Sequence, residues 1–269
     1  MTNNVAELAH GDFSALAEDY AMYRPGYAPV VLRAIAGLLN VPADQMDFVD
    51  VGAGTGIWTR SVAALGCRSV IAIEPNAAMR AQGESGNGDL SIVWRNGGGE
   101  ATGLPDACCD LLTMASSFHW TDYRKAVEEF ARVLRPDGWF AALWNTRFIE
   151  ANPVLVEIEA ELKRLVPELK RVSSGRSEFC DSLTERLRGD SPFHDVISLE
   201  GYHVEKMTTE RYIGIWRSVN DVRFQAGPER FARFLEFIQD KLKGSDSVEA
   251  TYLTRAWAAR RSMASPEVA

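Results

Sequence analysis

The chain has 269 residues, 46% of them apolar, which fits one large globular domain or one domain with an insertion. The formal net charge is −8 and there is no long basic run, which disfavours a nucleic-acid partner. No apolar run approaches the roughly 20 residues that cross a bilayer, and residues 1–10 lack the basic and apolar regions of a secretory signal. We therefore expect a cytoplasmic protein that binds no membrane.

The first half of the chain predicts an arm followed by alternating strands and helices. Residues 1–27 are expected to form an N-terminal arm and lid, and residues 28–269 the main domain. Apolar stripes at helical spacing predict helices between five short strands, at 48–51, 70–74, 92–94, 111–115 and 139–144. This alternation indicates an α/β fold with a mostly parallel sheet and helices on both faces.

The alternation stops after residue 145. The segment of about 146–195 carries helical stripes, and we expect a helical insertion over the carboxyl edge of the sheet, where ligands of α/β proteins bind. Its basic residues, among them Lys163 and Arg176, either attract an anionic substrate or form a solvated helix face. Two more predicted strands complete a seven-stranded sheet, with an amphipathic helix between them, at 196–204, 248–257 and 231–242.

A glycine-rich turn follows the first predicted strand. Its three glycines, at 52, 54 and 56, precede a helical pattern, and the next strand ends at Glu74. A strand, a glycine turn, a helix and a second strand tipped by a carboxylate bind an adenosine-containing cofactor. A dinucleotide site would have a third glycine at the position that Ile57 occupies. The turn therefore indicates a Rossmann-like fold without the full dinucleotide fingerprint.

The four cysteines predict no metal site. Cys67, Cys108, Cys109 and Cys180 form no C-x-x-C pair and no Cys/His cluster with zinc spacing. Reduced thiols are expected, and a vicinal disulfide between Cys108 and Cys109 is the alternative.

Four motifs in order resemble the class I S-adenosylmethionine-dependent methyltransferases. They are V-D-V-G-A-G-T-G at 49–56, E-P-N-A-A-M at 74–79, G-E-A-x-x-L-P at 99–105 and R-V-L-R-P-D-G at 132–138. Three further stretches resemble the type 11 small-molecule branch, which includes the trans-aconitate methyltransferase-like enzymes: Y-x-x-x-R-P-x-Y at 20–27, S-F-H-W at 117–120 and W-N-T-R at 144–147. The resemblance implies S-adenosyl-L-methionine as cofactor, S-adenosyl-L-homocysteine as product, and in-line methyl transfer to O, N or C of a small molecule.

The resemblance also implies which residues hold the cofactor. The glycines admit its methionine part, Glu74 accepts from the ribose hydroxyls, and Glu100 borders the adenine. Met79 either covers the adenine or belongs to the core. The expected cofactor-binding residues are Tyr20, Arg24, Gly52, Ala53, Gly54, Thr55, Gly56, Glu74, Pro75, Met79, Glu100, Ala101, Ser116 and Phe118.

The expected acceptor pocket lies beside the cofactor. Its residues are Tyr23, His119, Trp120, Trp144 and Asn145. His119 either takes a proton from the acceptor as a general base or only shapes the pocket.

Alternatives to a small-molecule methyltransferase stay open. Nucleic-acid amino-methyltransferases carry an Asp/Asn-Pro-Pro-aromatic motif where this chain has Ala115–Phe118, which favours a small-molecule acceptor. A dehydrogenase that uses NAD on the same fold, or a regulator that binds the cofactor without catalysis, are the alternatives. The oligomeric state is expected to be a monomer or a homodimer.

Overall fold

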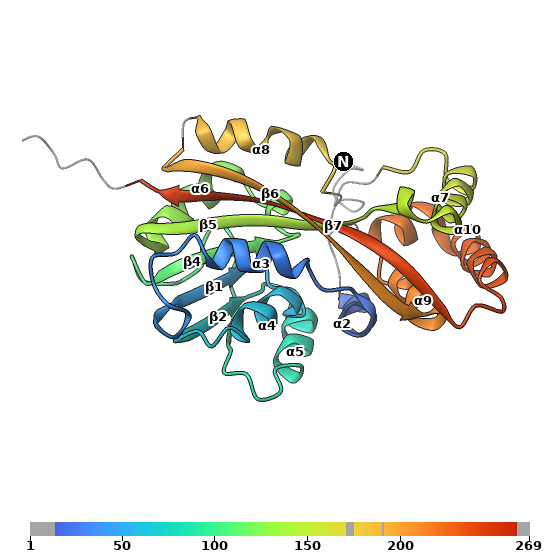
Figure 1. Ribbon diagram of the computed structural model, residues 1–269, viewed down its shortest axis with the longest axis horizontal. Coiled ribbons are helices and arrows are strands. Elements are labelled where there is room, and N and C mark those ends of the chain that lie inside the picture. The colour runs from blue at the N-terminus through green and yellow to red at the C-terminus, as the bar shows by residue number, and fades with distance from the viewer. Residues whose placement is uncertain (1–13, 171–174, 190, 263–269) are drawn as a thin grey trace, which may run out of the picture.

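A twisted seven-stranded sheet runs through the computed structural model, which describes residues 14–170, 175–189 and 191–262 (Figure 1). Residues 1–13 of the expected arm lie outside the described residues. The strand order is β3-β2-β1-β4-β5-β7-β6. The strands are β1 (Asp47–Val51), β2 (Ser69–Ile73), β3 (Val93–Arg95), β4 (Cys109–Ala115), β5 (Leu134–Arg147), β6 (Phe193–Thr208) and β7 (Ser247–Arg261).

The predicted mostly parallel sheet is confirmed. The first five strands pair in parallel, and β7 lies antiparallel between β5 and β6. All five residues of β1 are buried, as expected for a parallel strand that is covered on both faces. The carboxyl ends of β1, β2 and β4 therefore meet at one edge of the sheet.

Helices cover both faces of the sheet, as predicted. Helices α6 and α8 pack on one face through Phe130 and Leu183, and α3 and α4 pack on the other through Val31 and Trp58. The helices are α2 (Ala17–Tyr23), α3 (Pro29–Ala36), α4 (Ile57–Ala63), α5 (Ala77–Ser85), α6 (Tyr123–Val133), α7 (Pro153–Leu165), α8 (Glu178–Arg188), α9 (Thr209–Arg217) and α10 (Asn220–Lys241). The described residues also form four 3₁₀ turns: η1 (Ser14–Leu16), η2 (Ala43–Gln45), η3 (Phe118–Trp120) and η4 (Ile149–Ala151).

A second apolar cluster lies beyond the carboxyl edge of the sheet. Strands β6 and β7 extend past the other strands, and α7, α9 and α10 pack around their far ends (Figure 1). We call α7, α9 and α10 the distal lobe. The helix α10 is kinked at Gly227, where φ is +68°, directly before Pro228.

The structure divides the segment of about 146–195 between two places. Helix α7 belongs to the distal lobe through Leu155 and Ile158. Helix α8 instead packs on the sheet through Cys180 and Leu183. Both helices carry one apolar stripe, and a stripe shows that a face is buried without showing against what.

Helix α9 was not predicted, and its burial explains why. Five consecutive residues, from Tyr212 to Trp216, are buried. A short continuous apolar run of this kind is as consistent with a buried strand as with a helix, so periodicity alone does not identify it.

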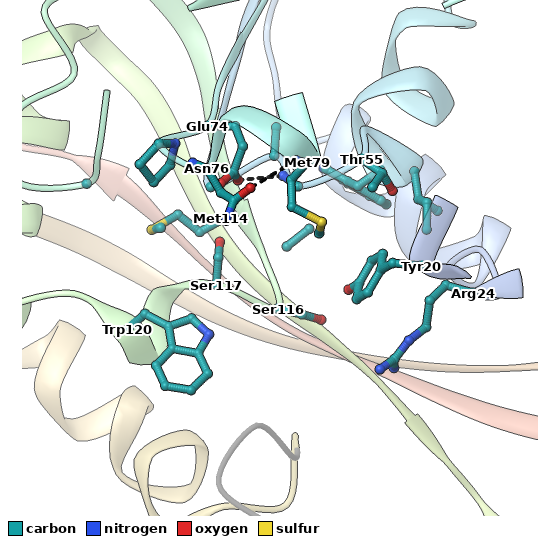
Figure 2. A pocket seen from close by; sticks show the side chains of 18 of the residues that line it. Tyr20, Arg24, Thr55, Glu74, Asn76, Met79, Met114, Ser116, Ser117 and Trp120 are labelled. Atoms are coloured by element: carbon teal, nitrogen blue, oxygen red, sulfur yellow. Dashed lines mark hydrogen bonds between the residues drawn. The ribbon is translucent and has the colours of Figure 1, made fainter. Parts of the chain in front are cut away.

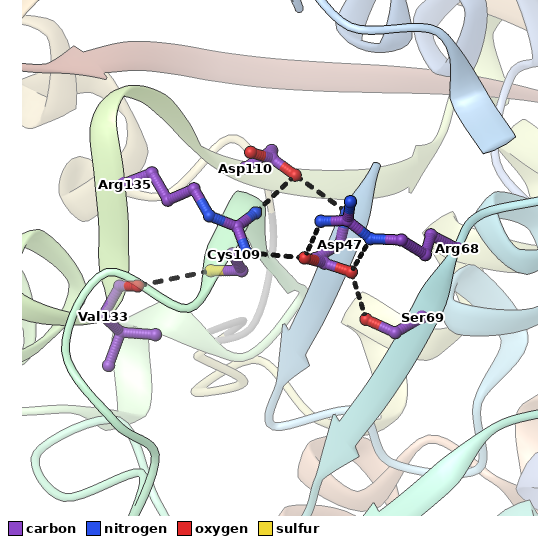
Figure 3. A network of polar contacts seen from close by, with 7 residues as sticks. All are labelled: Asp47, Arg68, Ser69, Cys109, Asp110, Val133 and Arg135. Atoms are coloured by element: carbon purple, nitrogen blue, oxygen red, sulfur yellow. Dashed lines mark hydrogen bonds and ion pairs between the residues drawn. The ribbon is translucent and has the colours of Figure 1, made fainter. Parts of the chain in front are cut away.

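An ion-pair network closes the amino edge of the sheet, opposite the glycine turn (Figure 3). Arg135 donates to Asp110 on β4 and to Asp47 on β1, at 2.7 and 2.6 Å. Arg68 also pairs with Asp47. The hydrogen bonds from Arg68 and the other neighbours hold the pKa of Asp47 well below its usual range. This network joins β1, β4 and the start of β5 at the edge of the sheet opposite the glycine turn.

We expect Arg135→Ala to lower the free energy of unfolding by about 1.5–3 kcal/mol at pH 7, because it removes charged hydrogen bonds from two carboxylates. Because the pKa of Asp47 is depressed in the folded state, its carboxylate stabilises the fold at pH values above its unfolded-state pKa of about 3.9. This contribution to stability is lost as the pH falls. The difference between wild type and variant, measured by urea unfolding, should therefore shrink below about pH 4. An equal difference at pH 7 and pH 3 would contradict this account.

Candidate functional site

A cavity of about 370 Å³ opens at the carboxyl edge of the sheet. It lies where the glycine turn follows β1, Glu74 follows β2 and Ser116 follows β4 (Figure 2). Helix α2 and residues 24–27 form another wall. Its volume lies within the roughly 300–1,000 Å³ of small-molecule sites. The cavity is thus at the position where α/β sheets bind ligands.

Glu74 holds the glycine turn in shape. Its Oε2 accepts from the amide of Gly54 at 2.8 Å, and its Oε1 accepts from the amide of Asn76 at 2.8 Å. Asn76 then caps α5 by accepting from the amides of Ala78 and Met79. The carboxylate is buried, and burial raises its pKa despite these hydrogen bonds. One carboxylate thus connects the turn after β1 to the start of α5.

A buried carboxylate lies beneath the same turn. Asp50 on β1 accepts from the hydroxyls of Thr59 and Thr113, at 2.6 and 2.8 Å. The indole of Trp58 donates to the hydroxyl of Thr113 at 3.0 Å. Burial raises the pKa of Asp50 to about 7, although both hydroxyl contacts lower it. This network connects β1, α4 and β4 under the cavity floor.

The backbone of the turn comes close to the cavity at Gly54. Its φ is +58°, and a Cβ there would meet only the terminal methyl group of Met79, at 3.5 Å. At Gly52 a Cβ would lie 2.6 Å from the hydroxyl oxygen of Ser117. Gly54 therefore leaves space inside the cavity, whereas Gly52 is fixed by close packing.

Because the Cβ position of Gly54 lies in open cavity space, we expect Gly54→Ala to fill part of the cavity. A Cβ would intrude on a cofactor seated on the turn and lower its affinity by about 1–3 kcal/mol. Gly66→Ala is the matched control, because Gly66 has φ of +85° and no neighbour within 4 Å of its Cβ position. Both variants carry the same kind of backbone strain. Calorimetry should show weakened S-adenosyl-L-homocysteine binding for Gly54→Ala alone, and equal affinities would refute the role of this glycine.

Residues 24–27, which follow α2, are hydrogen-bonded to the sheet and to the distal lobe. The side-chain amide of Asn145 donates to the carbonyl of Gly26 at 2.7 Å, and its oxygen accepts from Thr254. Arg24 donates through Nε to the hydroxyl of Ser218 at 2.8 Å and through Nη2 to the carbonyl of the same residue at 2.9 Å. The guanidinium also lies over the ring of Tyr20, 4.7 Å from its centroid. These contacts hold one wall of the cavity in place.

Two hydroxyls face one another at the end of β4. Tyr27 and Ser116 are hydrogen-bonded, 3.1 Å apart. Ser116 has φ of +60°, in the left-handed region that a non-glycine residue adopts at a cost. Burial raises the pKa of Tyr27, so its phenol stays protonated at neutral pH. The pair supplies neutral hydrogen-bonding groups to the cavity.

Most of the predicted site residues meet at this cavity. Residues from six separate stretches of the chain line it, and Figure 2 shows several of them. The predicted residues among the cavity-lining set are Tyr20, Arg24, Gly52, Ala53, Gly54, Thr55, Glu74, Pro75, Met79, Glu100, Ser116, Trp120 and Asn145.

Six predicted residues are not among those that line the cavity: Gly56, Ala101, Tyr23, Phe118, His119 and Trp144. Gly56 faces Arg60 and Trp94, and the ring of Tyr23 packs against Gly214 of the distal lobe. Ala101 pairs with Gly98 in a short bridge.

Phe118 and Trp144 belong to the aromatic core under α6 and α8. Phe118 is fully buried and packs against Phe140 and Phe179, at centroid distances of 5.1 and 5.6 Å. Trp144 is buried against Trp257, at 5.7 Å. Their side chains support the turn after β4 from behind.

His119 lies behind Trp120, between the cavity and the core. Its ring contacts Trp120 at a centroid distance of 4.6 Å, and its Nδ1 accepts from the indole of Trp144 at 3.3 Å. Its Nε2 is buried and has no partner among the described residues. Burial lowers the pKa of His119 to about 4, so the imidazole is neutral at pH 7.

Further residues line the cavity beyond the predicted set: Pro25, Tyr27, Ile57, Trp58, Asn76, Gly98, Gly99, Met114, Ala115, Ser117 and Thr121. Tyr27 and Ser117 stand in motifs that signalled the site, and Asn76 directly follows a predicted residue. Met114 carries no sequence signal, because it reads as an ordinary strand residue.

Comparison with protein families shows which known domain the central part of this site resembles. Residues 49–142 match the family model described as a methyltransferase domain. This segment is therefore similar to a methyltransferase domain. The match covers the glycine turn, Glu74 and the turn after β4, and it supports S-adenosyl-L-methionine as the cofactor that the sequence predicts.

Proteins similar to about half of this chain occur in bacteria and fungi. An uncharacterized methyltransferase of Mycobacterium tuberculosis is 34% identical over 135 residues, which cover 50% of this chain and 52% of the relative. One from Schizosaccharomyces pombe is 29% identical over 131 residues, 48% of this chain and 50% of the relative. The chain thus spans about half the length of the curated relatives it matches.

Solved structures share the fold of most of this chain. A protein from Anaeromyxobacter dehalogenans, named as a candidate type II methyltransferase, has a TM-score of 0.64 at 22% identity and covers 88% of this chain and 98% of its own. A protein from Anabaena variabilis, named as a candidate methyltransferase of an antibiotic biosynthesis pathway, has a TM-score of 0.61 at 19% identity, with 88% and 98% covered. These likenesses confirm the Rossmann-like α/β fold.

Within residues 14–170, 175–189 and 191–262, no helix is long and apolar enough to span a membrane. The same residues hold no group of three or more His, Cys, Asp or Glu side chains that could bind a metal ion.

Proposed function

We propose that the chain is an S-adenosylmethionine-dependent methyltransferase that acts on a small-molecule acceptor. The observation that carries this proposal is the cavity at the end of β1, β2 and β4, in which Glu74 and the glycine turn lie together. The methyltransferase domain match covers these same residues. The cofactor would lie along the turn, with its ribose at Glu74 and its sulfonium toward Ser116.

The residues of the cavity suit transfer that relies on alignment. Methyl transfer from a sulfonium is an in-line displacement with a good leaving group. Holding the acceptor in line and excluding water can contribute about 7–11 kcal/mol. Trp120, Tyr27 and the arm would enclose the acceptor beside Ser116. A cavity of this size, with residues 20–27 along one wall, favours a small molecule over a macromolecule.

Ligand binding tests this proposal against the dehydrogenase alternative. In isothermal titration calorimetry we expect saturable binding of S-adenosyl-L-homocysteine and no heat from NAD. Saturable binding of NAD without S-adenosyl-L-homocysteine would overturn the proposal. Transfer of label from [methyl-³H]S-adenosylmethionine to pooled metabolites then separates an enzyme from a regulator that only binds the cofactor.

His119→Ala tests whether a base takes part. General base catalysis contributes about 10²- to 10⁴-fold, but His119 lies outside the cavity lining and binds Trp144. We therefore expect kcat at saturating acceptor to fall less than about tenfold. His194→Ala, on β6 and hydrogen-bonded to Arg260, is the control. A larger loss for His119→Ala alone would assign it the role of base.

Cytoplasmic location and oligomeric state stay predictions.

A further inference from the structure

Strand β6 forms one edge of the sheet, and its outer side pairs with no other strand in the described part of the chain. Its register with β7 shifts between His194 and Ile197 and is then regular as far as Thr208. A long regular edge presents unpaired backbone groups that favour pairing with a further strand. Natural edge strands are commonly shortened, bulged or covered. Residues 197–208 of β6 pair with β7 without a bulge, and no other strand in the described part of the chain pairs with them.

The exposed face of β6 carries an apolar pair flanked by opposite charges. Alternate residues of a strand share a face. Tyr202 and Val204 on this face are 56% and 60% exposed, and Glu200 and Lys206 flank them. The order along the exposed face is therefore acidic, aromatic, aliphatic and basic.

This order is its own complement in an antiparallel pairing. When His203 lies opposite His203 of a second copy, Tyr202 of each copy faces Val204 of the other. In the same register Glu200 faces Lys206, again twice. Cross-strand apolar pairs and opposite charges each stabilise a sheet by about 0.2–1 kcal/mol. The apolar and the charged pairs thus favour one and the same register.

The neighbouring strand extends the charge pattern. Arg255 on β7 is in register with Glu200 and donates to it at 2.9 Å, and Glu249 is in register with Lys206. Across the joined sheets the charges would alternate as Arg255, Glu200, Lys206 and Glu249, with no like charges side by side. Each Glu200 would then lie between Arg255 of its own chain and Lys206 of the second copy.

Apolar side chains border the same edge on both faces. The ring of Tyr202 packs against Phe148, with centroids 5.2 Å apart. On the opposite face, Val30 of α3 is 48% exposed and lies beside Gly201. A second strand laid along β6 would cover these side chains from both sides.

We propose that the chain forms a two-fold symmetric homodimer by antiparallel pairing of two β6 strands centred on His203. The contact is isologous, because each patch binds the same patch of the partner. The two sheets then form one continuous sheet across the dimer. This proposal goes beyond the proposed function and does not depend on it.

Sedimentation velocity over a concentration series tests the dimer. We expect a species of twice the 29.8 kDa chain mass that dissociates on dilution. Val204→Lys should give a monomer, because two lysines would face apolar partners across the interface. Val93→Lys is the matched control, since Val93 is 51% exposed on β3 at the opposite edge of the sheet. Circular dichroism and thermal unfolding report that each variant is folded.

Charge exchange tests the register. Glu200→Lys alone or Lys206→Glu alone sets like charges opposite one another twice, and each should raise the dissociation constant about tenfold or more. The double variant restores opposite charges and should recover the affinity, whatever either change does to the stability of the single chain. A chain that stays monomeric at its highest soluble concentration overturns the dimer. A dimer unaffected by Val204→Lys, or no recovery in the double variant, overturns its assignment to β6.

Discussion

Glu74→Gln should weaken S-adenosyl-L-homocysteine binding about 10- to 150-fold. The carboxylate accepts from two backbone amides, at Gly54 and Asn76, and its side chain lines the cavity. An amide keeps only one acceptor oxygen, so the variant leaves one of these donors unmatched inside the site. Losing a hydrogen bond to a charged group costs about 1.5–3 kcal/mol. Calorimetry on folded protein measures the affinity directly.

Glu84→Gln is the control, because Glu84 is an exposed carboxylate on α5. Burial raises the pKa of Glu74, so the wild-type affinity should fall as the pH approaches that raised value from above. The glutamine variant has nothing to protonate there and should show no such fall. An unchanged affinity in Glu74→Gln would remove Glu74 from the cofactor site.

Arg147→Ala should lower the free energy of unfolding by about 3–5 kcal/mol. Arg147 ends β5, where the chain enters the distal lobe, and its side chain is 8% exposed. Its guanidinium lies 3.6 Å from the centroid of the Trp216 ring and 3.6 Å from the carboxylate of Glu159. Alanine removes both contacts and leaves space in the cluster that joins β5 to α7 and α9. Urea unfolding measures the loss.

Arg164→Ala is the matched control for this change. Arg164 also pairs with a glutamate of α7, Glu161, but its side chain is 61% exposed. Exposed pairs contribute about 0–1 kcal/mol. Similar losses for the two variants would mean that the stacking of Arg147 on Trp216 does not stabilise the lobe.

The parts of the fold that follow local rules were predictable from the sequence. The strand ending at Val51, the glycine turn and the strand before Glu74 follow from apolar runs and turn chemistry within some 25 residues of chain. The distal lobe depends on contacts between distant segments, such as Arg24 with Ser218. No local pattern reports contacts of that kind.

The candidate site divides in the same way. Backbone-defined positions such as Gly54 were predictable, because the turn itself requires them. The S-F-H-W stretch identified the turn after β4, but the one-turn helix η3 decides which side chains face the cavity. Phe118 and His119 turn inward there, and Trp120 lines the cavity. Adjacent residues in so short a helix point in different directions, so the sequence could not tell them apart.

The attachment of Arg24 to Ser218 limits how such a protein can diversify. Arg24 lines one side of the cavity and is hydrogen-bonded to Ser218 at the end of α9. A change in the distal lobe that moves the end of α9 would therefore disturb the cavity wall. Mutations elsewhere in α7 and α10 leave that attachment intact. We therefore expect related chains to vary freely over the outer helices of the lobe and to keep a hydrogen-bonding group where α9 ends.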